Sequence, residues 1–247
     1  MLRSLIAAMF ALAICATAFG AGELGERVTF TTSDGVTIVG TFVKGKLDKG
    51  GAVLLVHMLG RTRQDWDPIL KDYLLPETPY SYLAIDMRGH GESTQKEGKT
   101  ISFKNFSEND WRGIMTDIAA AVKYLRSRGD VNGDKIAIVG ASIGANAALN
   151  YALGDPRIAA IALLSPAFDY HSVGTLEVIG DYTGRPIFMA ASQDDLAAYG
   201  AVKQLRGMVG DKVTARIFPG NLHGTKMFGP DPIAKPLVAF LKESLGK

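Results

Sequence analysis

Lys135-Ile-Ala-Ile-Val-Gly-Ala-Ser-Ile-Gly-Ala-Asn-Ala-Ala-Leu-Asn-Tyr-Ala-Leu153 is the stretch that decides the fold. After the leading lysine, its first residues form a continuous apolar run, which predicts a strand buried on both faces. The alanine-rich run 144–153 predicts a helix. Between them lies G-x-S-x-G, in which larger side chains at Gly140 or Gly144 would collide within a sharp turn. We therefore expect Ser142 Oγ to be exposed at the start of a helix, where developing negative charge is stabilised.

Strand and helix patterns alternate along the rest of the chain. Residues 27–32 and 36–44 flank the turn signal Ser33-Asp34-Gly35 and predict an antiparallel hairpin. Further strands are expected at 52–57, 82–86, 135–140, 158–164, 186–191 and 214–218, and helices at 64–73, 109–128, 144–153, 197–209 and 233–245. This order predicts an α/β fold with one domain, residues 21–247. We expect a mostly parallel sheet with an N-terminal antiparallel hairpin, helices on both faces and a minimal cap.

Composition excludes several classes of protein. The chain has 247 residues, of which 47% are hydrophobic and 21% charged, so it is neither disordered nor collagen-like. Lys and Arg number 27 against 25 Asp and Glu, and no block of like charge occurs, so no nucleic-acid partner is expected. Cys15 is the only cysteine, which excludes an intrachain disulfide or a thiolate metal cluster.

The first residues have the pattern of an export signal. Arg3 precedes the uncharged run 4–22, and small residues near position 20 suit a signal peptidase. We expect residues 1–20 to be a cleaved signal peptide and the mature protein to be periplasmic or secreted, without stable membrane association. An uncleaved anchor is the alternative, since about 18 apolar residues can span a bilayer. Lipidation of Cys15 is disfavoured because the large Ile14 precedes it.

A serine hydroxyl is a weak nucleophile, so a base must lie within its reach. His57 and His90 precede the serine in the chain, and His171 follows no strand directly. His223 lies in the loop between the expected strand 214–218 and the last helix. From this loop a base can reach Ser142 at the carboxyl edge of the sheet, so His223 is the expected base. We expect His57 to bond the backbone of its own loop instead.

The carboxylate that orients the base should follow a strand between the serine and the histidine. Asp194 and Asp195 both follow the expected strand 186–191. Adjacent side chains point in different directions, so at most one of the two orients His223, and the other is expected to cap the next helix. Asp169, which follows strand 158–164, is a further candidate.

An oxyanion hole needs two backbone N–H groups aimed at one point. Ile143, directly after the nucleophile, is expected to supply one of them. The second is expected from the turn after strand 52–57, with Leu59 as the first choice and Met58 as the alternative.

These motifs together resemble the α/β-hydrolase superfamily over essentially the whole expected mature chain. His57-Met-Leu-Gly60 resembles its H-G-x-G oxyanion loop, and Asp86-Met-Arg-Gly-His-Gly-Glu-Ser93 resembles its D-x-R-G-x-G-x-S turn. Pro219-Gly-Asn-Leu-His-Gly224 is similar to its histidine loop. We interpret Asp86 and Arg88 as structural parts of their turn rather than as a catalytic pair.

The resemblance also favours one of the two adjacent aspartates. In the superfamily the acid commonly lies three residues after a small residue that ends the strand, and Ser192 in that position makes Asp195 the acid. The order Ser142, Asp195, His223 is then the superfamily's order. Two features depart from it: Met58 replaces the usual glycine, and Ser142 replaces the cysteine of the similar dienelactone hydrolases.

What the resemblance implies is a serine hydrolase that cleaves a carboxylic ester through a Ser-His-Asp triad and an acyl-enzyme, without a metal or organic cofactor. The connection 164–186 is too short for a large cap, so a small or exposed ester substrate is expected. A serine peptidase, a thioesterase, a cofactor-free haloperoxidase-like enzyme and a non-catalytic exported binding protein are the alternatives.

Overall fold

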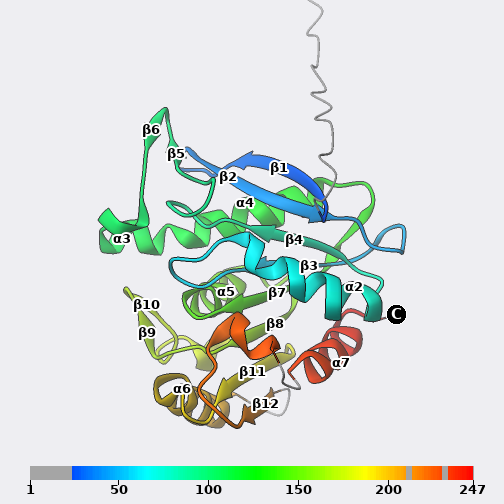
Figure 1. Ribbon diagram of the computed structural model, residues 1–247, viewed down its shortest axis with the longest axis vertical. Coiled ribbons are helices and arrows are strands. Elements are labelled where there is room, and N and C mark those ends of the chain that lie inside the picture. Colours follow the sequence, from blue (N-terminus) through cyan, green and yellow to red (C-terminus); the bar gives the residue numbers. More distant parts are fainter. Residues whose placement is uncertain (1–23, 210–212, 230–232, 247) are drawn as a thin grey trace, which may run out of the picture.

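The centre of the protein is a ten-stranded sheet, seen in a computed structural model that describes residues 24–209, 213–229 and 233–246. Its strands follow the order β12-β11-β8-β7-β3-β4-β2-β5-β6, and β1 pairs with β2 (Figure 1). Six of them run parallel: β3 (Gly50–Val56), β4 (Ser81–Ile85), β7 (Val131–Ala141), β8 (Ile158–Leu164), β11 (Ile187–Ser192) and β12 (Val213–Phe218). The mostly parallel sheet predicted from the sequence is confirmed.

The expected N-terminal hairpin is also present. β1 (Glu26–Thr31) pairs antiparallel with β2 (Val36–Val43), in a register that sets Glu26 opposite Phe42. Gly35 closes the turn with φ +83°, a conformation that glycine adopts without steric cost. Because β2 then runs antiparallel to β4, the hairpin extends the parallel sheet on one side.

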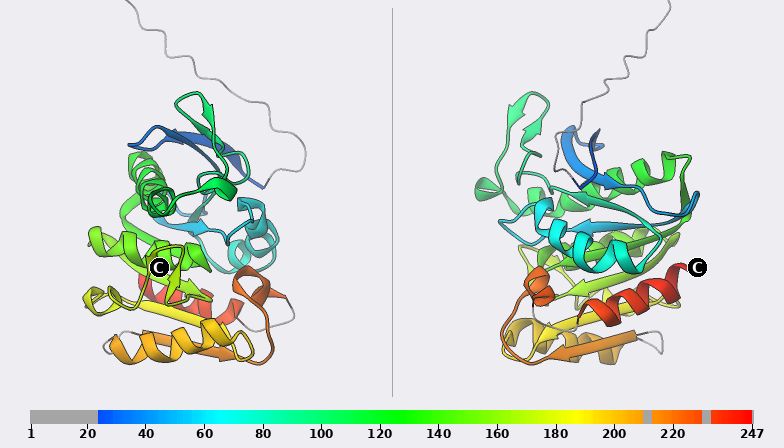
Figure 2. Two further views of the ribbon diagram at one scale, coloured as in Figure 1. Left: turned by 90° about the vertical axis from the view of Figure 1, so that its left-hand side faces the viewer. Right: turned by 45° about the vertical axis from the view of Figure 1, so that its right-hand side comes forward.

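Helices cover both faces of the sheet, as expected (Figure 2). One face packs against α4 (Ile114–Ser127), α5 (Ile143–Gly154) and α6 (Leu196–Met208). The other packs against α7 (Ala234–Leu245) and a helical stretch of four short pieces: η1 (Arg63–Trp66), α1 (Asp67–Ile69), η2 (Leu70–Leu74) and α2 (Leu75–Glu77). The central strands are therefore buried on both sides, which explains their continuous apolar runs.

Two expected helices differ from the structure. The stretch 64–73 is a succession of 3₁₀, α and π turns rather than one α-helix, and Pro68 within it removes a backbone donor. The stretch 109–128 divides into α3 (Glu108–Arg112) and α4 at Gly113. A Cβ at Gly113 would lie 2.1 Å from the Arg88 guanidinium, so the side chain of Arg88, from the turn after β4, fills the space beside the helix at this break.

Short elements that were not expected lie in the connections. β5 (Gln95–Lys96) and β6 (Lys99–Thr100) form one hairpin, and β9 (Asp169–Tyr170) and β10 (Val173–Gly174) form another. Three 3₁₀ turns complete the structure: η3 (Phe103–Asn105), η4 (Ile179–Asp181) and η5 (Gly224–Phe228). The connection 164–186 thus carries only a small hairpin and one turn. Within the described ranges, no helix has the length and apolar character needed to cross a membrane.

Candidate active site

Ser142 lies at the sharp turn between β7 and α5, with φ 56° and ψ −124°. In this sharp turn, the residues two positions before and two positions after Ser142 have no room for a side chain. A Cβ at Gly140 would lie 2.1 Å from the Gly144 carbonyl oxygen, and a Cβ at Gly144 would lie 2.7 Å from the His57 oxygen. The two glycines of G-x-S-x-G are therefore required by crowding, as the sequence predicted. Ser142 itself is only 5% exposed, less than we expected.

Asp195 and His223 come together at the carboxyl edge of the sheet. Asp195 follows β11, His223 follows β12, and His223 Nδ1 lies 2.6 Å from Asp195 Oδ2. The Asp195 side chain is 13% exposed and that of His223 is 33% exposed, so water only partly screens the pair. This geometry holds the imidazole in one orientation and leaves Nε2 available to another group.

The neighbouring aspartates are placed differently. Asp194 is exposed, and its backbone N–H donates to the Gly220 carbonyl at 2.8 Å. The N-cap of α6 is Asp195 itself, and its side chain makes no capping bond, so the expectation that the second aspartate caps this helix is wrong. Asp169 lies in β9, where Oδ1 accepts from the Ser172 N–H at 3.0 Å. Asp195 is thus the aspartate that reaches His223.

Contacts among the strand ends hold the histidine loop. Ser192 Oγ donates to the Leu222 carbonyl at 2.6 Å, and the Gly224 N–H donates to Ser165 Oγ at 2.9 Å. Gly224 has φ +55°, and a Cβ there would lie 2.4 Å from Met58 Sδ. The loop around His223 is therefore fixed to β8, β11 and the turn after β3 together.

Ser142 and His223 face one cavity of about 300 Å³, which is also lined by Met58, Leu59, Arg61 and Lys226. Among the described residues, no hydrogen bond joins Ser142 Oγ to His223, although such bonds often form only with substrate in place. Arg61 pairs with Asp65, with Nε and one terminal nitrogen each 2.7 Å from a carboxylate oxygen. Lys226 has no ion pair with any described residue, so it leaves the cavity wall positively charged. Sequence reasoning missed both cations.

His57 supports the turn that carries the proposed oxyanion donors. It is fully buried, its Nδ1 lies 2.6 Å from the Met58 carbonyl, and its Nε2 accepts from the Met87 N–H at 3.0 Å. Burial, reinforced by the positive charge of Arg61 and the nearby His90, lowers the pKa of His57 to about 3. His57 is thus neutral and structural, as expected.

Both residues considered for the second oxyanion donor face the cavity. Leu59 is 37% exposed and Met58 is 5% exposed. Ile143 is the first residue of α5, where a backbone N–H has no partner within the helix. Ile143 thus follows Ser142 directly with a backbone N–H that has no helical partner, and Met58 and Leu59 line the same cavity as Ser142.

The turn after β4 is built from buried ion pairs. Asp86 Oδ1 accepts from the Arg63 N–H at 2.7 Å and Oδ2 accepts from the Glu92 N–H at 2.9 Å, while the Arg63 guanidinium also binds Asp86. Arg88 bonds Asp117 from its backbone N–H and from Nε, each at 2.9 Å. The structural interpretation of Asp86 and Arg88 therefore agrees with their contacts.

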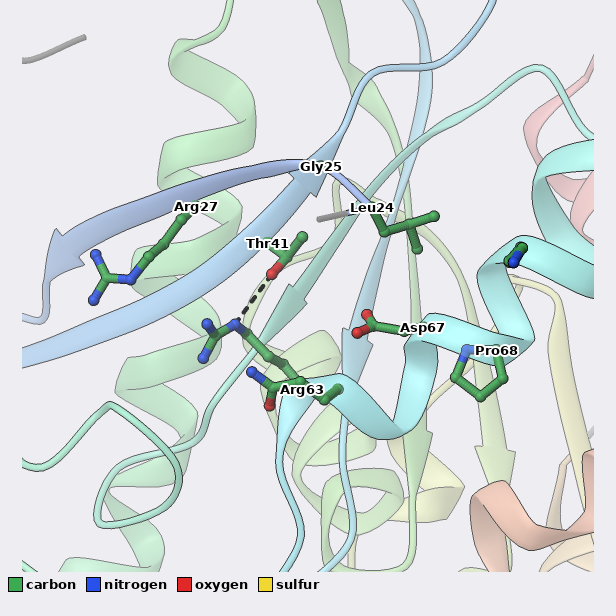
Figure 3. Close-up of a pocket in the computed structure, with 9 residues that line it drawn as sticks. Leu24, Gly25, Arg27, Thr41, Arg63, Asp67 and Pro68 are labelled. Atoms are coloured by element: carbon green, nitrogen blue, oxygen red, sulfur yellow. Dashed lines mark hydrogen bonds between the residues drawn. The ribbon is translucent and has the colours of Figure 1, made fainter. Parts of the chain in front are cut away.

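A second cavity of about 300 Å³ lies beside β1, β2 and the start of the helical stretch after β3 (Figure 3). Arg27, Arg63 and Asp67 lie around it, and the dashed line in the figure marks the 3.1 Å bond from Arg63 Nε to Thr41. None of the residues that line it also lines the Ser142 cavity. Within the described chain, no group of three or more His, Cys, Asp or Glu side chains is placed to hold a metal ion.

Known proteins are similar to this chain in sequence or in fold. A protein of Salmonella typhi described as uncharacterized protein YfhR is 28% identical over an alignment of 171 residues, with coverage of 63% of this chain and 53% of that protein. The chain thus spans about half the length of the curated relatives it matches. The Pyrococcus furiosus esterase Pf2001 superposes with a TM-score of 0.70 at 20% identity, over 90% of this chain and 93% of the esterase.

An esterase from Exiguobacterium antarcticum superposes with a TM-score of 0.67 at 12% identity, over 88% of this chain and all of that chain. At these identities the structural matches establish the fold alone. The family model of serine aminopeptidase S33 matches residues 48–181, more than half of the sequence, including Ser142 but not Asp195 or His223. The chain therefore belongs to the serine aminopeptidase S33 family of α/β hydrolases.

Proposed function

We propose that this protein is a serine hydrolase that cleaves carboxylic esters of small or exposed substrates. Ser142 acts as nucleophile, His223 as general base and Asp195 as the acid that orients it. The observation that carries the proposal is the 2.6 Å bond between Asp195 and His223, with His223 and Ser142 facing one cavity. A serine, a base and an orienting carboxylate in this relation are the parts that acyl transfer needs.

Acylation begins when Ser142 Oγ attacks the ester carbonyl carbon and His223 Nε2 takes the hydroxyl proton. The carbonyl π electrons move to oxygen, and the N–H groups of Ile143 and Leu59 stabilise the resulting charge. Asp195 stabilises the imidazolium. When the tetrahedral intermediate collapses, the carbonyl re-forms and the bond between carbon and the alcohol oxygen breaks. The alcohol oxygen takes the proton from His223, and the acyl group stays on Ser142.

The cavity suits a small acyl group. Its volume of about 300 Å³ is at the lower end for ligand sites, which run from roughly 300 to 1,000 Å³. Met58 and Leu59 supply an apolar wall of the cavity. Related folds can carry a large cap between the strands that correspond to β8 and β11, but here the described connection between them holds only one strand pair, the small hairpin β9–β10. Short-chain esters are therefore the substrates we propose.

The description of the family also raises a peptidase as a second candidate, because it names a serine aminopeptidase. An aminopeptidase must accept a free N-terminal ammonium group near the nucleophile. Arg61 and Lys226 line the Ser142 cavity, and Lys226 has no ion pair with a described residue, whereas Arg61 is paired with Asp65. The Lys226 ammonium repels the ammonium group of such a substrate. This electrostatic argument favours ester hydrolysis.

Labelling with a fluorophosphonate probe, read by peptide mass spectrometry, tests the nucleophile. We expect the probe on Ser142 and no hydrolysis of p-nitrophenyl acetate or butyrate by Ser142→Ala. Ser127→Ala is the matched control, because Ser127 lies at the end of α4 and bonds only the Tyr124 carbonyl. Ester hydrolysis by Ser142→Ala at the wild-type rate would refute the proposal. Faster cleavage of aminoacyl-p-nitroanilides than of esters would favour the peptidase.

We also propose that the protein is exported. The uncharged run after Arg3 supports this proposal, but the expected signal peptide lies outside the described residues. N-terminal sequencing of the mature protein tests it: a start near residue 21 supports cleavage, and a start at Met1 in the membrane fraction supports the anchor instead.

A further inference from the structure

Lys226 is a cation beside the nucleophile to which the proposed triad gives no role. It lies in η5 and lines the same cavity as Ser142 and His223. The residue is exposed, and its ammonium group forms no ion pair with the residues that the structure describes. In a cavity of about 300 Å³, an unpaired ammonium places a positive charge close to any bound substrate.

The turn η5 holds the backbone of Lys226 in place relative to the proposed base. The Lys226 N–H donates to the His223 carbonyl at 3.1 Å, and the Lys226 carbonyl accepts from the Gly229 N–H at 3.3 Å. Its neighbours Thr225 and Met227 are buried, and Lys226 is the one residue of η5 that is not. The base of the side chain is therefore fixed, while its flexible four-carbon stem lets the ammonium follow a ligand.

The carboxylates around this cavity already have partners. Arg61 binds Asp65 through Nε and a terminal nitrogen, each 2.7 Å from a carboxylate oxygen. Asp195 Oδ2 lies 2.6 Å from His223 Nδ1. Neither carboxylate forms an ion pair with Lys226, so among the described residues the lysine is the cation of this cavity that has no counter-charge.

We infer that Lys226 determines specificity, by selecting ester substrates that carry a carboxylate group. The inference rests on the proposed function and adds a substrate class to it. Met58 and Leu59 offer an apolar wall to the short carbon chain of such an ester, and the Lys226 ammonium pairs with its carboxylate. The carboxylate belongs either to the acyl part, as in a monoester of a short dicarboxylic acid, or to the alcohol part.

Selection by Lys226 differs from a general electrostatic effect. A cation near the triad can change the rate for every substrate alike, through the charges that develop during catalysis. An ion pair with the substrate instead changes the ratio of kcat/KM between a charged ester and a neutral one of the same shape. This ratio is the informative quantity, because it is also independent of the fraction of each variant that is correctly folded.

Two pairs of esters of matched shape test the inference, with hydrolysis followed by pH-stat titration. Monoethyl succinate has its carboxylate in the acyl part, and its neutral counterpart is ethyl isohexanoate. The acetate ester of γ-hydroxybutyrate has its carboxylate in the alcohol part, and its counterpart is isohexyl acetate. Lys226→Gln should lower the charged-to-neutral ratio by roughly 3- to 10-fold in one of the pairs, the effect of an ion pair partly screened by water. The pair that responds identifies the part of the ester that Lys226 binds.

Two further measurements support the same interpretation. Lys226→Glu should lower the ratio further than Lys226→Gln, because it replaces attraction by repulsion. Added salt should bring the wild-type ratio towards that of Lys226→Gln. Lys71→Gln is the matched control: Lys71 is also exposed and without an ion pair to a described residue, but it lines the second cavity, so its ratio should stay that of wild type.

Three outcomes would overturn the inference. The first is a wild-type ratio in Lys226→Gln for both pairs of esters. The second is an equal loss of kcat/KM on charged and neutral esters, which would mean a general effect on catalysis. The third is an equal fall of the ratio in Lys71→Gln, which would mean that the field of the whole protein selects the substrate. Ser142→Ala separates the two levels: if it cleaves the neutral esters like wild type, the proposed function fails, whereas if only the ratio is unchanged in Lys226→Gln, this inference fails alone.

Discussion

His57 should make the folded protein less stable in mild acid, because the turn after β3 depends on this histidine, which cannot accept a proton while folded. His57 Nε2 accepts a hydrogen bond from the Met87 N–H, so Nδ1–H is the donor to the Met58 carbonyl. A proton on Nε2 would place two donors against each other in a fully buried site. This conflict, added to the loss of solvation, agrees with a pKa of His57 near 3.

The size of the effect follows from the two pKa values of His57. The folded value is about 3, and the unfolded value is about 6.5. Because the folded pKa is the lower one, the unfolded chain binds more protons between these values. The stabilisation is fully present above pH 6.5 and is lost as the pH falls from 6.5 towards 3. From pH 7.5 to pH 5 the loss is about 2 kcal/mol from this residue.

Urea unfolding at pH 7.5 and pH 5, followed by tryptophan fluorescence, measures this loss. His57→Gln is the informative variant, because glutamine offers a donor and an acceptor but does not titrate. The variant should be less stable than wild type at pH 7.5, but its free energy of unfolding should fall by about 2 kcal/mol less between the two pH values. An equal fall in both proteins would refute the assignment of the acid sensitivity to His57.

Further predictions concern the triad, the sharp turn and the buried ion pair. Asp195→Asn should lower kcat on a p-nitrophenyl ester by about 10⁴-fold, because Asp195 bonds His223. Asp194 is exposed, so Asp194→Asn should stay within about twofold of wild type. Equal effects of the two variants would contradict the assignment of Asp195 as the triad acid. Gly144→Ala should lower the free energy of unfolding by about 1–3 kcal/mol through overpacking, while Gly154→Ala, with no atom within 4 Å of the new Cβ, should not destabilise in thermal unfolding. Arg63→Met leaves its fully buried carboxylate partner unpaired and should cost about 3–5 kcal/mol in urea unfolding; a cost under about 1 kcal/mol would show that the pair is solvated.

The central strands could be predicted because burial on both faces leaves a continuous apolar run in the sequence. The expected strand 158–164 coincides with β8, and 214–218 differs from β12 by one residue. The helical breaks could not be predicted in the same way. Gly113 interrupts 109–128 where the Arg88 guanidinium approaches, and Arg88 comes from a turn more than twenty residues earlier. The hydrophobic periodicity of residues 109–128 depends only on neighbouring residues, so it does not reveal such a long-range contact.

The same distinction separates the parts of the candidate site. Ser142, Asp195 and His223 each follow a parallel strand, and the carboxyl ends of such strands meet at one edge, so their meeting could be expected from chain order alone. The hairpin β9–β10 beside α5 has no comparable signal. Each of its strands is two residues long, and His171-Ser172 is not a typical turn sequence. Bonds from Asn146 and Asn150 of α5 and the stacking of His171 on Trp111 place this hairpin, and these contacts depend on packing between elements far apart in the sequence. Strand order therefore identifies the groups proposed to transfer the proton, whereas the hairpin in the connection 164–186 forms through long-range packing that no local sequence pattern reveals.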